Sequence, residues 1–156
     1  MKHEMAEKAS IAWFKLAECI ERGEKERAFN LHRLLMHSHG DEPYRKKLEA
    51  DLLLFFDKNS SLDYYFQAAA LYRSAGQHNE VVFLYEHVVK IFPDVVELYM
   101  PLVEFCQANG WFKKALRYVE ELLKLCEKAP NTHQDLLIAC VEKRGALRRA
   151  QPGMDK

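Results

Sequence analysis

The chain has 156 residues, a length typical of one domain, and hydrophobic residues make up 49% of it. Its 23 basic and 23 acidic side chains cancel, so charge gives no reason to expect nucleic acid or an acidic membrane as a partner. No apolar run approaches the ~20 residues of a membrane-spanning helix, and the charged N-terminus is unlike a signal peptide.

The four cysteines all fall within helical apolar patterns, and none are in a C-x-x-C spacing. We expect such thiols to be small buried hydrophobic residues without a disulfide. This usage suits a reducing compartment and predicts a cytoplasmic protein. The cysteines are Cys19, Cys106, Cys126 and Cys140.

The N-terminal segment predicts two helices joined by a glycine. Residues 4–22 carry the first helical pattern, and Gly23 ends it. Residues 24–38 carry the second pattern, with Ala28 on its apolar face. The two patterns together predict an antiparallel pair of helices.

A third helix is predicted after a loop. Asp41 is a candidate N-cap, and Pro43 follows where a missing backbone N–H costs little. The apolar pattern then covers residues 43–56. Asn59 and Ser60 are expected to interrupt the helical pattern before the next helix.

The stretch from Ser61 to Asp94 contains two helical patterns with a break between them. Gly76 lies at the break, and Pro93 ends the second pattern because it has no backbone N–H to donate. The apolar positions recur at helical spacing, with Tyr65, Ala68, Ala69 and Tyr72 before the glycine and Val81, Leu84, Tyr85 and Val88 after it.

The following segment repeats this pattern at a distance of 34 residues, so that Tyr65 falls on Tyr99 and Gly76 falls on Gly110. The period and these residue types resemble the tetratricopeptide repeat (TPR) family. The best copies are residues 62–95 and 96–129, and the second copy has Val103, Cys106 and Glu127 where the family prefers a small residue, an aromatic and a proline.

The resemblance implies an all-α fold, a TPR-like right-handed α-solenoid of about eight antiparallel helices. We expect a single domain over residues 1–150, with residues 132–150 as a capping helix. Residues 151–156 are expected to be a frayed tail.

Two pairings of the central helices fit the apolar spacing. Counting from the N-terminus makes residues 61–75 the second helix of a pair, whereas the alignment on Gly76 makes them a first helix. The alignment on Gly76 matches more positions and is preferred. It leaves residues 43–56 as an inserted single helix.

The C-terminal half predicts two further helices before the cap. Asp94 is a candidate N-cap for residues 95–108, and Pro101 within them is expected to cause a kink. Residues 111–128 form the next pattern, and Pro130 separates it from the capping helix.

No catalytic motif is visible, since the sequence has no phosphate-binding glycine loop, no nucleophile motif and no metal-protease or EF-hand spacing. We therefore expect no enzyme activity and no cofactor. The histidine cluster of His32, His37 and His39 is interpreted as surface residues rather than a metal site. The basic residues of the last helix, among them Arg144 and Arg148, are interpreted as a solvated helix end. The alternative is an acidic partner or a nucleic acid, although no interleaved aromatic residues support the latter.

In the family, the first helix of each pair lines a concave binding side, so the resemblance implies a peptide-binding surface here. The implied residues are Trp13 and Ala17 in the first pair, Asp63, Phe66, Ala70 and Arg73 in the second, and Glu97, Met100, Glu104 and Gln107 in the third. Family members that hold a C-terminal carboxylate use Lys and Asn at such positions. The residues present here argue against that mode.

The preferred function is a non-catalytic, cytoplasmic adaptor that binds a peptide or helix of a partner protein in its concave groove. One alternative is a small secretion-type chaperone for an unfolded client. A second alternative is a structural subunit that self-associates through an exposed apolar stripe. Neither a nucleic acid nor a membrane is expected as a partner.

Overall fold

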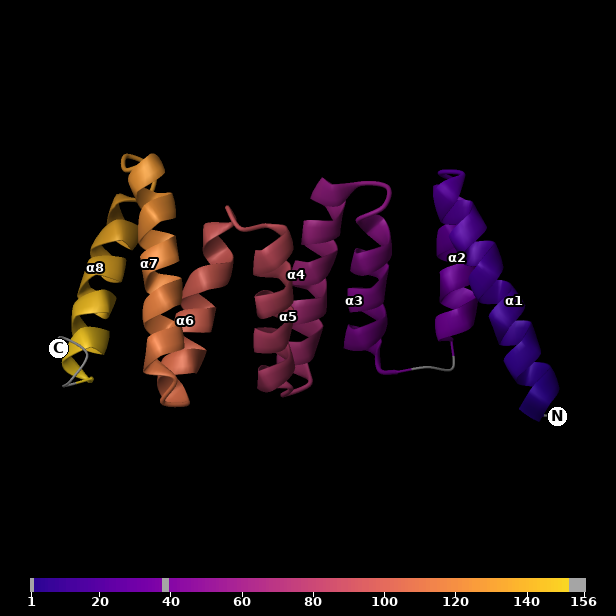
Figure 1. Cartoon of the computed structure of the whole chain (residues 1–156), viewed down its shortest axis with the longest axis horizontal. Helices are drawn as coiled ribbons and strands as arrows, with labels where there is room; N and C mark the ends of the chain where they lie inside the picture. Colours follow the sequence, from indigo (N-terminus) through magenta and orange to yellow (C-terminus); the bar gives the residue numbers. More distant parts are fainter. Residues whose placement is uncertain (1, 38–39, 152–156) are drawn as a thin grey trace. The chain divides into compact units, whose positions relative to one another are not determined.

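A computed structural model describes residues 2–37 and 40–151 of the chain (Figure 1). Over these residues the chain forms eight α-helices, one short 3₁₀ helix and no strand, which confirms the predicted all-α class. The chain divides into two compact units, Met1–His78 and Asn79–Lys156. The expectation of one domain over residues 1–150 stays a prediction.

The first unit contains four helices, each antiparallel to the one before (Figure 1). They are α1 (Lys2–Glu21), α2 (Lys25–Met36), α3 (Glu42–Leu53) and α4 (Lys58–Ser74). α1 packs on α2, and α3 packs along α4. The segment expected to be an inserted single helix is therefore a packed neighbour of α4.

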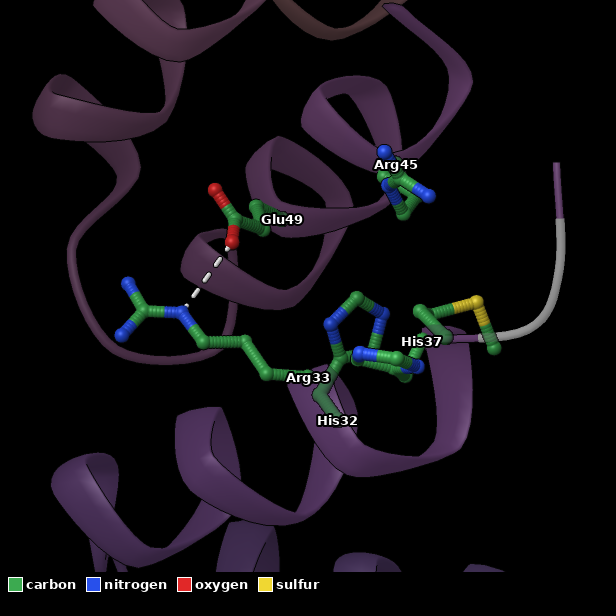
Figure 2. Close-up of a pocket in the computed structure, with 6 residues that line it drawn as sticks. His32, Arg33, His37, Arg45 and Glu49 are labelled. Carbon is green, nitrogen blue, oxygen red and sulfur yellow. Dashed lines mark hydrogen bonds and ion pairs between the residues drawn. The ribbon is translucent and has the colours of Figure 1, made fainter. Parts of the chain in front are cut away.

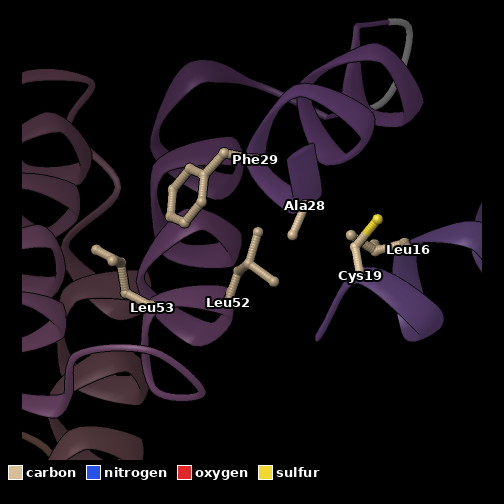
Figure 3. Close-up of a cluster of buried hydrophobic side chains, with 6 residues drawn as sticks. All are labelled: Leu16, Cys19, Ala28, Phe29, Leu52 and Leu53. Atoms are coloured by element: carbon tan, nitrogen blue, oxygen red, sulfur yellow. The ribbon is translucent and has the colours of Figure 1, made fainter. Parts of the chain in front are cut away.

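The core of the first unit joins its first three helices (Figure 3). Ala28 of α2 is fully buried beside residues of α1 and α3. A side chain this small lets neighbouring helices approach closely, and the larger apolar groups fill the remaining space. The buried cluster consists of Leu16 and Cys19 from α1, Ala28 and Phe29 from α2, and Leu52 and Leu53 from α3.

The start of α4 differs from the prediction. Asn59 and Ser60 do not separate two helices but lie in the first turn of α4, which begins at Lys58. Asp57 is the reason, because its carboxylate accepts the backbone N–H of Ser60 at 3.1 Å and caps the helix. The Ser60 hydroxyl also donates to Asp57, and these bonds lower the pKa of the Asp57 carboxyl.

The predicted cap of α3 is confirmed. The Asp41 carboxylate accepts the backbone N–H of Tyr44 at 3.1 Å, and Pro43 lies in the first turn of the helix. The other oxygen of Asp41 accepts a hydrogen bond from the side chain of Gln77 at 3.1 Å. Asp41 thus ties the start of α3 to the turn that follows α4.

Three glycines end helices with the same backbone geometry. Gly23, Gly76 and Gly110 have φ between 70° and 72°, a left-handed conformation that strains any residue with a Cβ. In each case the glycine N–H donates to the backbone carbonyl of the residue three positions earlier. The N–H of the next residue donates to the carbonyl of the residue five positions before it. This is the Schellman motif, which satisfies the last carbonyls of a helix. The repeat inferred from sequence is thus also a repeat of backbone hydrogen bonds.

The second unit carries the remaining helices, among which α6 and α8 both pack on α7. They are α5 (His78–Ile91), the 3₁₀ helix η1 (Val96–Leu98), α6 (Tyr99–Ala108), α7 (Phe112–Lys128) and α8 (Gln134–Arg149). Leu102 of α6, Leu122 of α7 and Cys140 of α8 are all fully buried. These three positions belong to the apolar patterns that predicted the helices.

The segment before α6 corrects two predictions. Asp94 does not cap the helix, because the chain first forms η1, whose N-cap is Val95. α6 itself begins only at Tyr99, so Pro101 lies in its first turn. The first N–H groups of a helix have no partner within it, so the proline removes no bond there. The expected kink is replaced by the change from 3₁₀ to α-helix.

Candidate functional site

Four predicted binding residues lie on α4, and we call them the α4 row: Asp63, Phe66, Ala70 and Arg73. Asp63, Ala70 and Arg73 are exposed, and Phe66 is half-buried. The buried face of α4 instead carries Tyr65, Ala68 and Ala69 among others. The structure therefore places the predicted row away from the most buried face of its helix.

Four more predicted residues lie on η1 and α6, and we call them the α6 row: Glu97, Met100, Glu104 and Gln107. Glu97 and Glu104 are exposed, whereas Met100 and Gln107 are half-buried. The Gln107 side chain accepts a hydrogen bond from Lys143 of α8 at 3.0 Å. This hydrogen bond links Gln107 of α6 to α8, a contact that its sequence position did not indicate.

Trp13, the predicted binding residue of the first pair, is 47% exposed on α1. Ile11 and Phe14 on the same helix are 50% and 76% exposed. The buried residues of α1 are Leu16 and Cys19. The N-terminal helix therefore presents a group of large apolar side chains to solvent, and we call Ile11, Trp13 and Phe14 the α1 patch.

A pocket of about 270 Å³ lies between α2 and α3 (Figure 2). α2 supplies residues from its last turn and beyond, and α3 supplies residues from its middle. Figure 2 shows the two histidines on one side and Arg45 and Glu49 on the other. The lining residues are His32, Arg33, Met36, His37, Arg45 and Glu49.

His32 is the least exposed polar residue of this pocket, at 5%. Its Nδ1 atom is buried and has no hydrogen-bond partner within the described residues 2–37 and 40–151. Burial lowers the pKa of the imidazole, although Glu49 and Asp51 act in the opposite direction. The ring is therefore neutral near pH 7 and can donate one hydrogen bond and accept another.

The histidine prediction needs correction. His32 is not a surface residue, because α3 and the end of α2 cover it. His37 is exposed, as predicted, and His39 lies outside the described residues. Sequence reasoning missed the pocket because Arg45 and Glu49 approach His32 only after α3 folds back beside α2.

The cysteines are buried thiols, as predicted from their apolar spacing. Burial raises the pKa of Cys106 and Cys126, and that of Cys140 to about 11. A thiol must lose its proton to act as a nucleophile. Burial therefore favours the protonated form of these three thiols, which pack as small apolar side chains.

Among the described residues, no helix is both long and apolar enough to cross a membrane. Within the same residues, no three His, Cys, Asp or Glu side chains are grouped to hold a metal ion.

The comparisons add little to this description. No protein-family model matches the sequence, and no curated protein matches it. A solved structure titled "MamA RS-1 ArsTM double mutant" is 16% identical, and the alignment covers 92% of this chain and 96% of that chain with a TM-score of 0.36. A score of this size does not establish a shared architecture, so the fold description rests on the helices themselves.

Proposed function

We propose that the protein is a non-catalytic, cytoplasmic adaptor that binds a peptide or helical segment of another protein, with the α4 row of the first unit and the α6 row of the second unit each serving as a binding surface. One observation carries the proposal. Both rows lie on helices that end in the same glycine turn, 34 residues apart, and both leave charged side chains exposed opposite a buried stripe. Exposed side chains on a rigid helix are what a binding surface requires.

The two rows combine apolar and charged groups. Phe66 and Met100 are half-buried, so each offers part of its apolar surface to a ligand. Arg73, Glu97 and Glu104 are exposed and would set the charge preference for the partner segment. Anchored apolar groups supply most of the affinity in such surfaces, and the charges around them supply specificity.

Site-specific photo-crosslinking tests this proposal. A photoreactive phenylalanine analogue replaces Ala70 in one variant and Glu104 in another, because both side chains are exposed. Matched controls carry the same analogue at Asn30 of α2 and Lys124 of α7, which are also exposed but lie outside both rows. We expect the same partner to be crosslinked from positions 70 and 104 and not from the controls. Equal labelling from all four positions would contradict the proposal.

Self-association is a second candidate, and the α1 patch favours it. Large apolar side chains that are exposed together on one element can mark an interaction surface. Phe14, at 76% exposure, is its most accessible member. If the patch joins two copies, Phe14→Glu will shift the chain from dimer to monomer in sedimentation equilibrium. A wild-type chain that sediments as a monomer would exclude this candidate.

A further inference from the structure

We propose that the pocket between α2 and α3 binds a phosphate group, either as inorganic phosphate or as a phosphoryl group on a side chain of another molecule. This inference goes beyond the adaptor proposal, because it uses none of the residues of the α4 row or the α6 row. It rests on the unpartnered His32 Nδ1, on the arrangement of charge, and on the directions from which donors reach the space (Figure 2).

One imidazole nitrogen of the pocket has no hydrogen-bond partner within the described residues. A buried polar atom without a partner costs about 1–3 kcal/mol, so native structures seldom keep one without a reason. His32 Nδ1 is such an atom, within a residue that is 5% exposed. The residue lines an open pocket and does not lie in a closed core. The nitrogen itself has almost no accessible surface, so the imidazole ring would have to turn slightly for a ligand oxygen in the pocket to give it the missing hydrogen bond.

The charged side chains that line the pocket also favour an anion. Glu49 is the only acid among the lining residues, and its carboxylate is already engaged by two cations. Arg33 Nε lies 3.3 Å from one of its oxygens, and Lys46 Nζ lies 3.6 Å from the other. Arg45 adds a further positive charge on the same side of the pocket. The pocket is thus positive overall and suits an anion better than a cation.

The directions from which hydrogen-bond donors approach the pocket also favour a phosphate group. Arg45 directs Nη1 at the carbonyl of Gly40, at 3.4 Å, which leaves its Nε and Nη2 as further donor atoms. His32 and His37 face Arg45 from the opposite side of the pocket (Figure 2). Donors therefore approach the space from three side chains. A phosphoryl group presents three acceptor oxygens and can meet all three, whereas a carboxylate has two.

The state of His32 fits this role. The neutral ring carries one proton, and the nitrogen that holds it is the one facing the better acceptor. An anion in the pocket would place that proton on Nδ1. Nitrogen-15 NMR of the imidazole side chains distinguishes the two tautomers and so gives a readout specific to this atom.

The test uses the full chain labelled with nitrogen-15 and titrated at pH 7.5 with inorganic phosphate, with O-phosphoserine in a blocked tripeptide, and with acetate. We expect saturable binding of both phosphate probes, a shift of the His32 Nδ1 resonance, and at least tenfold weaker binding of acetate. If the tripeptide binds at least tenfold tighter than inorganic phosphate, the source is a phosphorylated partner; similar affinities indicate free phosphate.

Two variants and one control make the test specific. Arg45→Met removes a lining charge, and His32→Phe removes the unpartnered nitrogen; each should weaken phosphate binding at least tenfold. Arg22→Met is the control, since Arg22 is an exposed arginine outside the pocket. Wild-type protein that shows no saturable binding, or unchanged binding in Arg45→Met, would overturn the proposal. This test needs no partner protein, so its failure leaves the adaptor proposal standing.

Discussion

The Tyr65 hydroxyl of α4 donates a hydrogen bond of 2.5 Å to the Asp51 carboxylate of α3. Tyr65 is 1% exposed, and burial together with the carboxylate raises the pKa of its hydroxyl. Lys47 also reaches Asp51, at 2.8 Å. The aromatic residue that marks the repeat in sequence is therefore the residue that joins α4 to the helix before it.

Tyr65→Phe should destabilise the protein by about 2 kcal/mol, because a hydrogen bond to a charged group in a buried setting is lost while the ring still packs. Urea unfolding followed by circular dichroism measures this change. Tyr64→Phe is the matched control, since Tyr64 is half-buried and its ring face, not its hydroxyl, contacts Lys46. An equal loss in both variants would show that the Tyr65–Asp51 bond adds nothing of its own.

Gly110→Ala should cost about 1–2 kcal/mol, because an L-residue at a φ of 72° is strained. No atom lies within 4 Å of the added Cβ, so the loss would come from the backbone alone. Gly145→Ala in α8 is the control in the same unit, and it should stabilise by up to about 1 kcal/mol since alanine favours helix. Differential scanning calorimetry should separate the two variants in opposite directions.

Asp57→Ala should destabilise by about 1 kcal/mol, the usual effect of losing an N-cap. Asp57→Asn is the control, because its amide oxygen can still accept the Ser60 N–H that Asp57 accepts at 3.1 Å. Amide hydrogen exchange in the first turn of α4 should accelerate in the alanine variant and stay near wild type in the asparagine variant. Similar exchange in all three proteins would show that the cap does not set the start of α4.

The stability of the protein should depend on His32 below about pH 6.5. Burial lowers the pKa of its imidazole in the folded state, with Arg33 acting in the same direction and Glu49 and Asp51 opposing it. The unfolded chain therefore binds the proton first, and stability falls as pH decreases from about 6.5 towards the folded-state pKa. Above that window the contribution is constant.

Urea unfolding of wild type and of His32→Phe at pH 5 to 8 isolates this contribution, since the other titrating groups are common to both proteins. We expect the difference in unfolding free energy between the two proteins to change with pH between 5 and 6.5. A difference that stays constant across the whole range would remove His32 as its source.

The sequence predicted the helices well wherever a local signal controls them. The glycine at each turn and the cap at Asp41 are short-range features, and both appear in the structure. Prediction failed where neighbouring signals compete. Asp57 starts α4 earlier than Asn59 and Ser60 suggested, and the 3₁₀ helix η1 delays the start of α6 so that Pro101 lies in its first turn.

The candidate sites likewise include residues that the sequence pointed to and residues that it did not. Ala70 and Glu104, which the resemblance to the repeat family placed on a binding side, are exposed, and their role in binding stays a prediction. The pocket around His32 was not predicted, because it depends on the approach of Arg45 and Glu49 from another helix. No spacing within α2 carries that information. The contacts between helices could thus not be predicted from the sequence of this chain.

The most direct test of the adaptor proposal is the affinity of the crosslinked partner segment for three forms of the protein, measured by isothermal titration calorimetry. The forms are wild type, a row variant with Ala70→Glu and Glu104→Lys, and a control variant with Asn30→Glu and Lys124→Glu. The account predicts that the row variant binds at least tenfold more weakly than wild type, while the control variant binds as wild type does. Equal affinity for wild type and the row variant would contradict it.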